Sequence, residues 1–110
     1  MLNKNWIVGF TEGEGCFSRG IQTDKSTKGN PRRKYPSFQV TQKDDTILYS
    51  LKKYFGFGHV CKSGNNCRAY QVRGFKSCKQ IAKFFKGVLI TPYKKKQFDN
   101  WCKEFKLLAC

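Results

Sequence analysis

The stretch of sequence that decides the fold covers residues 6–17 and reads Trp6-Ile7-Val8-Gly9-Phe10-Thr11-Glu12-Gly13-Glu14-Gly15-Cys16-Phe17. Its apolar first part predicts a short helix that begins near Asn3 and ends by about Thr11. Gly9 and Gly13 remove side chains from one stripe of that helix, so another backbone can approach closely. A second copy of the same helix is the natural partner. Glu14 follows the predicted helix end, where the helix dipole is negative and favours a bound cation.

Downstream of this stretch, the hydrophobic pattern twice has the form of a β-hairpin. Residues 16–23 and 35–43 alternate between apolar and polar side chains and flank a polar, basic loop at residues 24–34. They predict the first hairpin. Residues 59–63 and 67–74 flank a Gly64-Asn65-Asn66 turn and predict the second hairpin.

Each hairpin is followed by a predicted helix, and one further helix comes last. Apolar residues at helical spacing predict a helix after Asp44, a helix that Ser77 opens through a capping box, and a helix that begins at Thr91-Pro92. The last helix has on one face Phe98, Trp101, Phe105 and Leu108. The order α-ββα-ββα-α predicts a single α+β domain over residues 1–110, with a four-stranded antiparallel sheet backed by helices.

One face of this sheet is expected to stay uncovered and to carry hydrogen-bonding side chains. By the alternation, these are Ser18, Gln22, Gln39, Thr41, Ser63, Gln71 and Arg73. Such side chains suit the reading of base edges in a DNA groove. An ordinary solvated face of an antiparallel sheet has the same composition, so the alternation alone fits both interpretations.

The charge balance indicates the class of partner. The 110 residues include 22 Lys and Arg against 7 Asp and Glu, a formal net charge of +15. Such a field attracts polyanions, and neutralised phosphates add affinity through counterion release. A membrane surface is the competing partner, but the sequence has no run of about 20 apolar residues and no long amphipathic helix with a wide apolar face. Nucleic acid is therefore the predicted partner, and no membrane is expected.

The six cysteines are compatible with three interpretations. An even number of cysteines in a short chain is typical of a secreted, disulfide-linked protein. Against this, the first residues lack the apolar region of a signal peptide, which predicts an intracellular protein. A zinc site is disfavoured because no two cysteines are spaced Cys-x-x-Cys and His59 is the only histidine. The predicted state is free thiols in a reducing compartment.

The motif and its ordered neighbours resemble the LAGLIDADG homing endonuclease family, in its single-motif, homodimeric type. Residues 9–15, with the form Gly-Phe-x-Glu-Gly-Glu-Gly, resemble the family motif, and residues 38–43 resemble its second strand with a terminal glutamine. Residues 55–60, 70–72 and 94–97 resemble the entry to the third strand, the fourth strand and the basic start of the late helix. The resemblance covers nearly the whole chain in order and implies the family's curved sheet.

The resemblance implies an enzyme that makes metal-dependent double-strand cuts in long, nearly palindromic DNA by phosphodiester hydrolysis. One motif supplies half a site, so a homodimer is implied, with Gly9 and Gly13 at its interface. Glu14 is the implied metal ligand and Mg²⁺ the implied ion, because hard oxygen ligands suit it. Gln42 is implied to position solvent. Within the run Lys94-Lys95-Lys96, Lys95 is the first choice, and Lys94 the second, for stabilising the charge that develops in the reaction.

The resemblance also implies a structural residue, and together with the alternation it predicts a set of DNA contacts. Glu12 matches an acidic position that stabilises the turn beneath the site. The side chains expected to contact DNA are Ser18, Gln22, Arg33, Ser37, Gln39, Ser63, Gln71 and Arg73. Taken singly, Glu14, Gln42 and the lysine run are equally typical of solvated helix and strand ends, and only the ordered set of matches indicates a site.

Two alternative functions share this fold: a splicing cofactor that binds intron RNA (a maturase), and a DNA-binding protein that does not cleave. An intron-encoded protein of this type is expected in a mitochondrion or chloroplast. Many family members continue past this core with helices that clamp the DNA backbone. A chain truncated at Cys110 and a minimal form are therefore both consistent with the resemblance.

Overall fold

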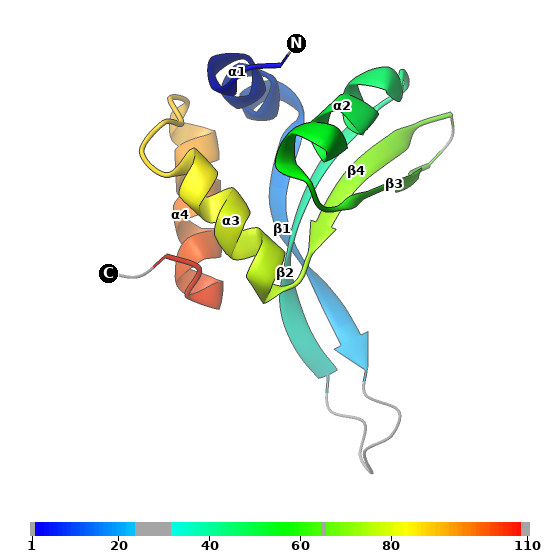
Figure 1. Ribbon diagram of the computed structural model, residues 1–110. Helices are drawn as coiled ribbons and strands as arrows, with labels where there is room; N and C mark the ends of the chain where they lie inside the picture. Colours follow the sequence, from blue (N-terminus) through cyan, green and yellow to red (C-terminus); the bar gives the residue numbers. More distant parts are fainter. Residues whose placement is uncertain (1, 24–31, 65, 109–110) are drawn as a thin grey trace.

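The computed structural model describes residues 2–23, 32–64 and 66–108 and has an α-ββα-ββα-α order. Strands β1 (Gly15–Thr23), β2 (Arg32–Gln42), β3 (His59–Lys62) and β4 (Arg68–Arg73) form one antiparallel sheet in the order β1-β2-β4-β3. Helices α1 (Lys4–Glu14), α2 (Thr46–Phe55), α3 (Phe75–Phe85) and α4 (Pro92–Phe105) pack against this sheet, and the long β1–β2 hairpin projects beyond them (Figure 1). The predicted fold class is confirmed.

Helix α1 is longer than the sequence pattern predicts. Its N-cap is Asn3, near the predicted start of the helix, and the Asn3 side-chain oxygen accepts a hydrogen bond from the Trp6 N–H at 2.9 Å. The helix continues through Gly13 and ends at Glu14, so Glu14 is the last helical residue and does not lie beyond the helix. The chain then extends at Gly15, where an added Cβ would lie 2.5 Å from the Thr11 side chain. Only glycine fits this tight passage from helix to strand.

The first hairpin pairs residues from Gly15↔Val40 to Thr23↔Arg32. Strand β2 therefore begins three residues before the predicted start at residue 35, because the pairing with β1 continues into the basic segment that was predicted as loop. The rest of that predicted loop, residues 24–31, lies outside the described residues, as does Asn65 in the predicted second turn.

Helix α2 begins close to the predicted position, after Asp44. The Asp44 carboxylate accepts a hydrogen bond from the Thr46 N–H at 2.9 Å, although Asp45 occupies the N-cap position. Gly56 ends the helix in the left-handed conformation, with φ 83°, which glycine adopts without steric cost.

The predicted start of α3 is wrong. The helix begins at Phe75, so Ser77 lies inside it and forms no capping box with Gln80. Gly74, with φ 94°, turns the chain directly out of β4, and its N–H donates to the Pro36 carbonyl at 3.0 Å. The sheet therefore fixes where this helix begins.

Helix α4 begins at Pro92 with Thr91 as its N-cap residue, as predicted. It ends at Phe105, so Leu108 lies past the helix, and Leu107 is the buried residue of the tail. Lys106 adopts a left-handed conformation at φ 52° and reverses the chain there, which breaks the helical spacing that the sequence suggested.

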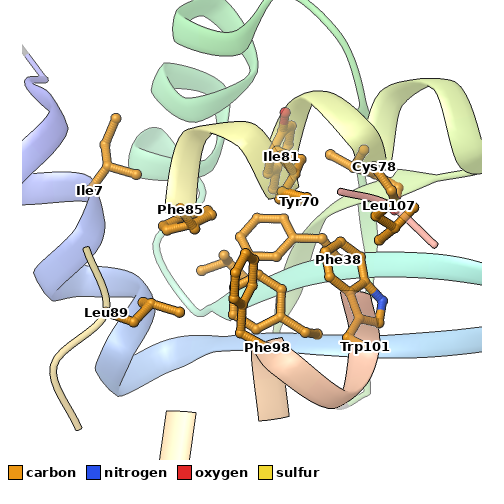
Figure 2. Close-up of a cluster of buried hydrophobic side chains, with 14 of the residues drawn as sticks. Ile7, Phe38, Tyr70, Cys78, Ile81, Phe85, Leu89, Phe98, Trp101 and Leu107 are labelled. Carbon is orange, nitrogen blue, oxygen red and sulfur yellow. Dashed lines mark hydrogen bonds between the residues drawn. The ribbon is translucent and has the colours of Figure 1, made fainter. Parts of the chain in front are cut away.

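The core lies between the sheet and the helices (Figure 2). Phe17 is its hub, because its ring centroid lies 5.0–5.5 Å from the rings of Phe38, Phe85, Phe98 and Trp101. One side chain of β1 thus connects the motif to β2, α3 and α4. Aromatic pairs at this spacing add to the stabilisation from buried area.

The five cysteines within the described ranges are free thiols. Cys78 is fully buried, and this burial raises the pKa of its thiol to about 12, so it serves as a small core residue. Across residues 2–23, 32–64 and 66–108, no helix is long and apolar enough to cross a bilayer.

Candidate active site and nucleic-acid interface

Helix α1 presents an exposed stripe in which two of the three residues are glycines. Trp6, Gly9 and Gly13, at positions i, i+3 and i+7, are all exposed. A Cβ added at Gly9 or Gly13 would meet no atom within 4 Å. Trp6 is 43% exposed and stacks on Phe10 with ring centroids 4.9 Å apart. We refer to Trp6, Gly9 and Gly13 as the α1 stripe, a surface that another helix can approach closely.

Glu14 is the last residue of α1, and its side chain is exposed beside the end of the α1 stripe. No group of three or more His, Cys, Asp and Glu residues that could hold a metal ion occurs in the part of the chain that the structure describes. The exposed carboxylate of Glu14 therefore stands at the end of α1 without a cluster of further such residues among the described ones.

Glu12 joins the end of α1 to the start of α4. Its Oε1 atom accepts hydrogen bonds from the Ile90 N–H at 2.8 Å, the Thr91 N–H at 2.7 Å and the Thr91 hydroxyl at 2.8 Å. The N–H groups of Thr91 and Ile90 hold the pKa of Glu12 below its ordinary value. The carboxylate satisfies backbone groups at the amino end of α4, where negative charge is stabilising. This agrees with the structural role that the resemblance implied.

Lys94 lies against the motif, whereas Lys95 faces solvent. The Lys94 side chain is only 7% exposed, and its Nζ atom donates to the Gly15 carbonyl at 2.6 Å and to Gln97 Oε1 at 3.2 Å. Lys95 is exposed, and its side chain forms no hydrogen bond or ion pair with any described residue. The geometry therefore favours Lys94, the second choice from the sequence, as the lysine beside Glu14.

Helix α4 covers the free edge of β1 with side chains spaced one helical turn apart. Gln97 Oε1 accepts a hydrogen bond from the Phe17 N–H at 3.2 Å. The Trp101 indole N–H donates a hydrogen bond to the Ser18 carbonyl at 2.7 Å. Glu104 pairs with Arg19 at 3.0 Å. Gln97 belongs to residues 94–97, which resemble the start of the family's late helix, but the sequence assigned no role to it. Its spacing of one helical turn from Lys94 is the local signal for such a role.

Gln42 ends β2 at the same end of the sheet as Glu14. Its strand neighbour Val40, two residues earlier, pairs with Gly15, so Gln42 lies beside the carboxyl end of α1. Next to it is a hollow of about 670 Å³, which is lined by Lys43, Lys62, Gly64, Asn66, Cys67 and Arg68. This end of the sheet thus combines the exposed carboxylate of Glu14, the Gln42 amide and several cations, of which Arg68 pairs with Asp45 at 3.4 Å.

The uncovered sheet face carries a connected row of polar side chains. Gln39, Gln71 and His59 are cross-strand neighbours, as are Ser18, Ser37 and Arg73. Gln71 donates to Gln39 Oε1 at 3.1 Å and accepts from Arg73 Nη2 at 2.8 Å. We refer to this surface as the open face.

The remaining predicted DNA contacts differ in exposure. Arg33 is exposed on the projecting part of β2, and Ser63 is half-buried after β3. Ser18 is half-buried, and Ser37 is 8% exposed. Gln22 lies in β1 opposite Arg33, but its side chain lies outside the described residues.

The comparisons with known proteins agree with this geometry. The LAGLIDADG endonuclease family model matches residues 7–105, so this chain belongs to the LAGLIDADG endonuclease family. The predicted family is confirmed. Endonucleases of this family use divalent metal ions.

Curated relatives are similar to this chain over most of its length. A probable intron-encoded endonuclease 4 of Neurospora crassa is 34% identical over 94% of this chain and 18% of its own length. A probable intron-encoded endonuclease Cox1-I1b of Schizosaccharomyces pombe is 37% identical over 73% of this chain and 21% of its own length. The chain thus spans about a fifth of the length of these relatives.

Solved structures share the fold closely. The homing endonuclease I-TnaI has a TM-score of 0.84 and 31% identity, over 96% of this chain and 72% of its own. The archaeal intron-encoded homing endonuclease I-Vdi141I, which was solved in complex with DNA, has a TM-score of 0.78 and 30% identity, over 94% of this chain and 66% of its own.

Proposed function

We propose that this chain is a DNA-cutting subunit of a site-specific homing endonuclease that hydrolyses both strands of a long, nearly palindromic site with a divalent metal ion. The observation that carries the proposal is the buried ammonium group of Lys94, which lies 2.6 Å from the Gly15 carbonyl, next to exposed Glu14. A carboxylate and a cation at the exposed end of the motif helix are the groups that phosphodiester hydrolysis needs. Family membership and the net charge of +15 support the same activity.

The α1 stripe supports assembly with a second copy of the motif helix. Because Gly9 and Gly13 leave space for a neighbouring backbone, two identical helices could pack there around a two-fold axis. Each copy would bring its own Glu14 to the same end of the seam. A homodimer would then cut two strands related by the same symmetry, which explains a nearly palindromic target.

The residues at this end fit a hard divalent ion, and we propose Mg²⁺. Glu14 offers carboxylate oxygen, and a second Glu14 from a partner copy, together with DNA phosphate oxygens, would complete an oxygen-only ligand set. The ion would activate water and stabilise the leaving oxygen. The exposure of Glu14 leaves its oxygens accessible to such a ligand set.

The remaining groups act on the phosphate and on solvent. We assign to Lys94 the donation of a hydrogen bond to a phosphate oxygen, because its ammonium group has three donors and uses two of them within the chain. Gln42, at the end of β2, is assigned to hold the attacking water by its side-chain amide. Both groups are neutral or cationic, so neither repels the phosphate.

The open face is the proposed surface that reads double-stranded DNA. Gln39 and Gln71 offer paired amide groups, and Arg73 offers a guanidinium fork, the groups that read adenine and guanine edges in the major groove. The hydrogen bonds among them hold these side chains in one arrangement before DNA binds. Arg33 would extend the contact along the projecting hairpin.

The alternatives are binding without cleavage, either of DNA or of intron RNA. The same charge and open face would serve both, so activity separates them, and the combination of Glu14 with Lys94 favours the enzyme. A mitochondrial or chloroplast location is proposed as well. It is supported by relatives whose names place them in introns, one of them in ND4 intron 1 of Podospora anserina.

The proposal is tested by incubating the purified protein with a library of random duplexes, with Mg²⁺ and, in parallel, with a chelator. Sequence-defined double-strand cuts that require the metal are expected. Duplexes that are bound selectively but never cut would show a non-cleaving DNA-binding protein. Binding of structured RNA in preference to every duplex would favour the splicing cofactor.

A further inference from the structure

We infer that Gln97 is a positioning residue that fixes the ammonium group of Lys94 through its side-chain amide oxygen. The inference rests on the proposed function, because it concerns the lysine assigned there to the phosphate. Gln97 Oε1 lies 3.2 Å from Lys94 Nζ and 3.2 Å from the Phe17 backbone nitrogen. One oxygen atom therefore links the lysine to strand β1.

The orientation of the Gln97 amide follows from its partners. A backbone N–H and an ammonium group can only donate hydrogen bonds, so the atom that both approach must be the amide oxygen. Phe17 cannot shift to accommodate a different arrangement, because its ring is 4% exposed and forms the hub of the aromatic core. The core thus holds the Phe17 N–H in place. This N–H positions the Gln97 amide oxygen, which in turn positions the Lys94 ammonium group.

The environment of Lys94 explains why this fixation matters. A buried ammonium group is costly unless it is hydrogen-bonded, and here the Gly15 carbonyl and the Gln97 amide are its two oxygen acceptors within the described chain. With two N–H groups engaged, the direction of the third is determined by the tetrahedral geometry of the nitrogen. Loss of Gln97 would free the ammonium group to rotate about a single remaining bond.

The Gln97 side chain is uncharged, and this affects how strongly the charge of Lys94 acts on a phosphate. A carboxylate at this position would hold the ammonium group more tightly but would form an ion pair and cancel the field that a phosphate senses. An amide oxygen positions the cation and leaves its charge intact. This distinction separates the effects of Gln97→Met, which removes the acceptor, from those of Gln97→Glu, which keeps the acceptor and adds a charge.

The first measurement is independent of cleavage. In protein labelled with ¹⁵N-lysine, the Lys94 ammonium signal, identified by its absence in Lys94→Met, is expected to show slow proton exchange. Gln97→Met should abolish this protection, whereas Gln97→Glu and the control Asn100→Met, an exposed polar residue of the same helix, should retain it. An unprotected Lys94 in the parent protein, or unchanged protection in Gln97→Met, would overturn the inference.

The second measurement is single-turnover cleavage of the duplex selected from the library. Gln97→Met should lower the rate by about 10- to 100-fold, the effect of losing a hydrogen bond to a charged group, with DNA affinity unchanged. In a Lys94→Met background the same substitution should have no further effect on the rate, because Gln97 acts through Lys94. An equal loss of cleavage rate in the parent and in the Lys94→Met background would show that Gln97 acts only through its contact with the edge strand β1. If the parent protein cuts no duplex, the proposed function fails, while the exchange measurement still decides the role of Gln97.

Discussion

The Nζ atom of Lys94 lies 2.6 Å from the carbonyl oxygen of Gly15, the residue that follows Glu14 and begins β1. This contact places a cation from the late helix α4 beside the last residue of the motif helix α1. Glu12 stabilises the same junction, because its carboxylate accepts hydrogen bonds from the N–H groups of Ile90 and Thr91. The motif thus organises groups from both ends of the chain around one point.

The first prediction concerns the choice of lysine. Lys94→Met should lower the single-turnover cleavage rate by about 100- to 1000-fold, the usual effect of removing one donor that stabilises developing negative charge. Lys95→Met is the matched control, because it removes the same charge from the solvent-facing side of α4 and should cleave at nearly the parent rate. A large loss in Lys95→Met with a small loss in Lys94→Met would restore Lys95 as the catalytic lysine.

The second prediction concerns the α1 stripe. Gly13→Leu should leave the fold of the single chain intact, because a Cβ at this position meets no atom within 4 Å. It should block the approach of a second helix, so analytical ultracentrifugation in the presence of duplex DNA should show one copy where the parent shows two, and double-strand cutting should be lost. Persistence of the two-copy complex in both Gly13→Leu and Gly9→Leu would place the interface elsewhere.

The third prediction concerns the pH dependence of Glu12. Because hydrogen bonds from Thr91 and Ile90 lower the pKa of Glu12 below 4.5 in the folded state, its stabilisation is present above this value and is lost as the pH falls through the folded pKa. Glu12→Gln should therefore melt at a lower temperature than the parent at pH 7, and calorimetry should show this difference shrinking as the pH falls below 4.5. A difference that grows under acid conditions would contradict the assignment.

The fourth prediction compares the open face with the exposed surface of α3. Arg73→Gln, on the open face, should weaken binding of the selected duplex by about 1–3 kcal/mol and relax the preference at one base pair of each half-site. Lys79→Gln removes the same charge from the exposed surface of α3 and should have only a small effect, independent of sequence. Fluorescence anisotropy at fixed salt measures both. Equal effects of the two substitutions would indicate that only the net charge matters.

The sequence predicted the fold well wherever one local pattern had a single physical meaning. The alternation of residues 35–43 predicted a strand, and Phe38 and Val40 of this strand are buried in the core. The predicted capping box at Ser77 failed because the start of α3 is fixed by Gly74 and its contact with β2, a tertiary feature that local sequence does not contain.

The candidate site was predictable only in part, for a similar reason. Glu14 follows from the motif itself, but the choice between Lys94 and Lys95 depends on the rotation of α4 about its axis relative to β1. That rotation is set by contacts between residues about eighty positions apart, such as Gln97 with Phe17. The local sequence places Gln97 one helical turn from Lys94 but does not encode these contacts, so the role of Gln97 follows only from the structure.

The proposed role of Glu14 as the metal ligand is tested by strand cleavage of the selected duplex by Glu14→Gln in Mg²⁺. DNA affinity is measured in parallel. This substitution removes the ligand charge with little change in volume, and Asp99→Asn, on the exposed surface of α4, is the matched control. We expect Glu14→Gln to bind the duplex with nearly the parent affinity and to cut neither strand, while Asp99→Asn cuts normally. Cleavage by Glu14→Gln at the parent rate would show that Glu14 does not hold the metal ion.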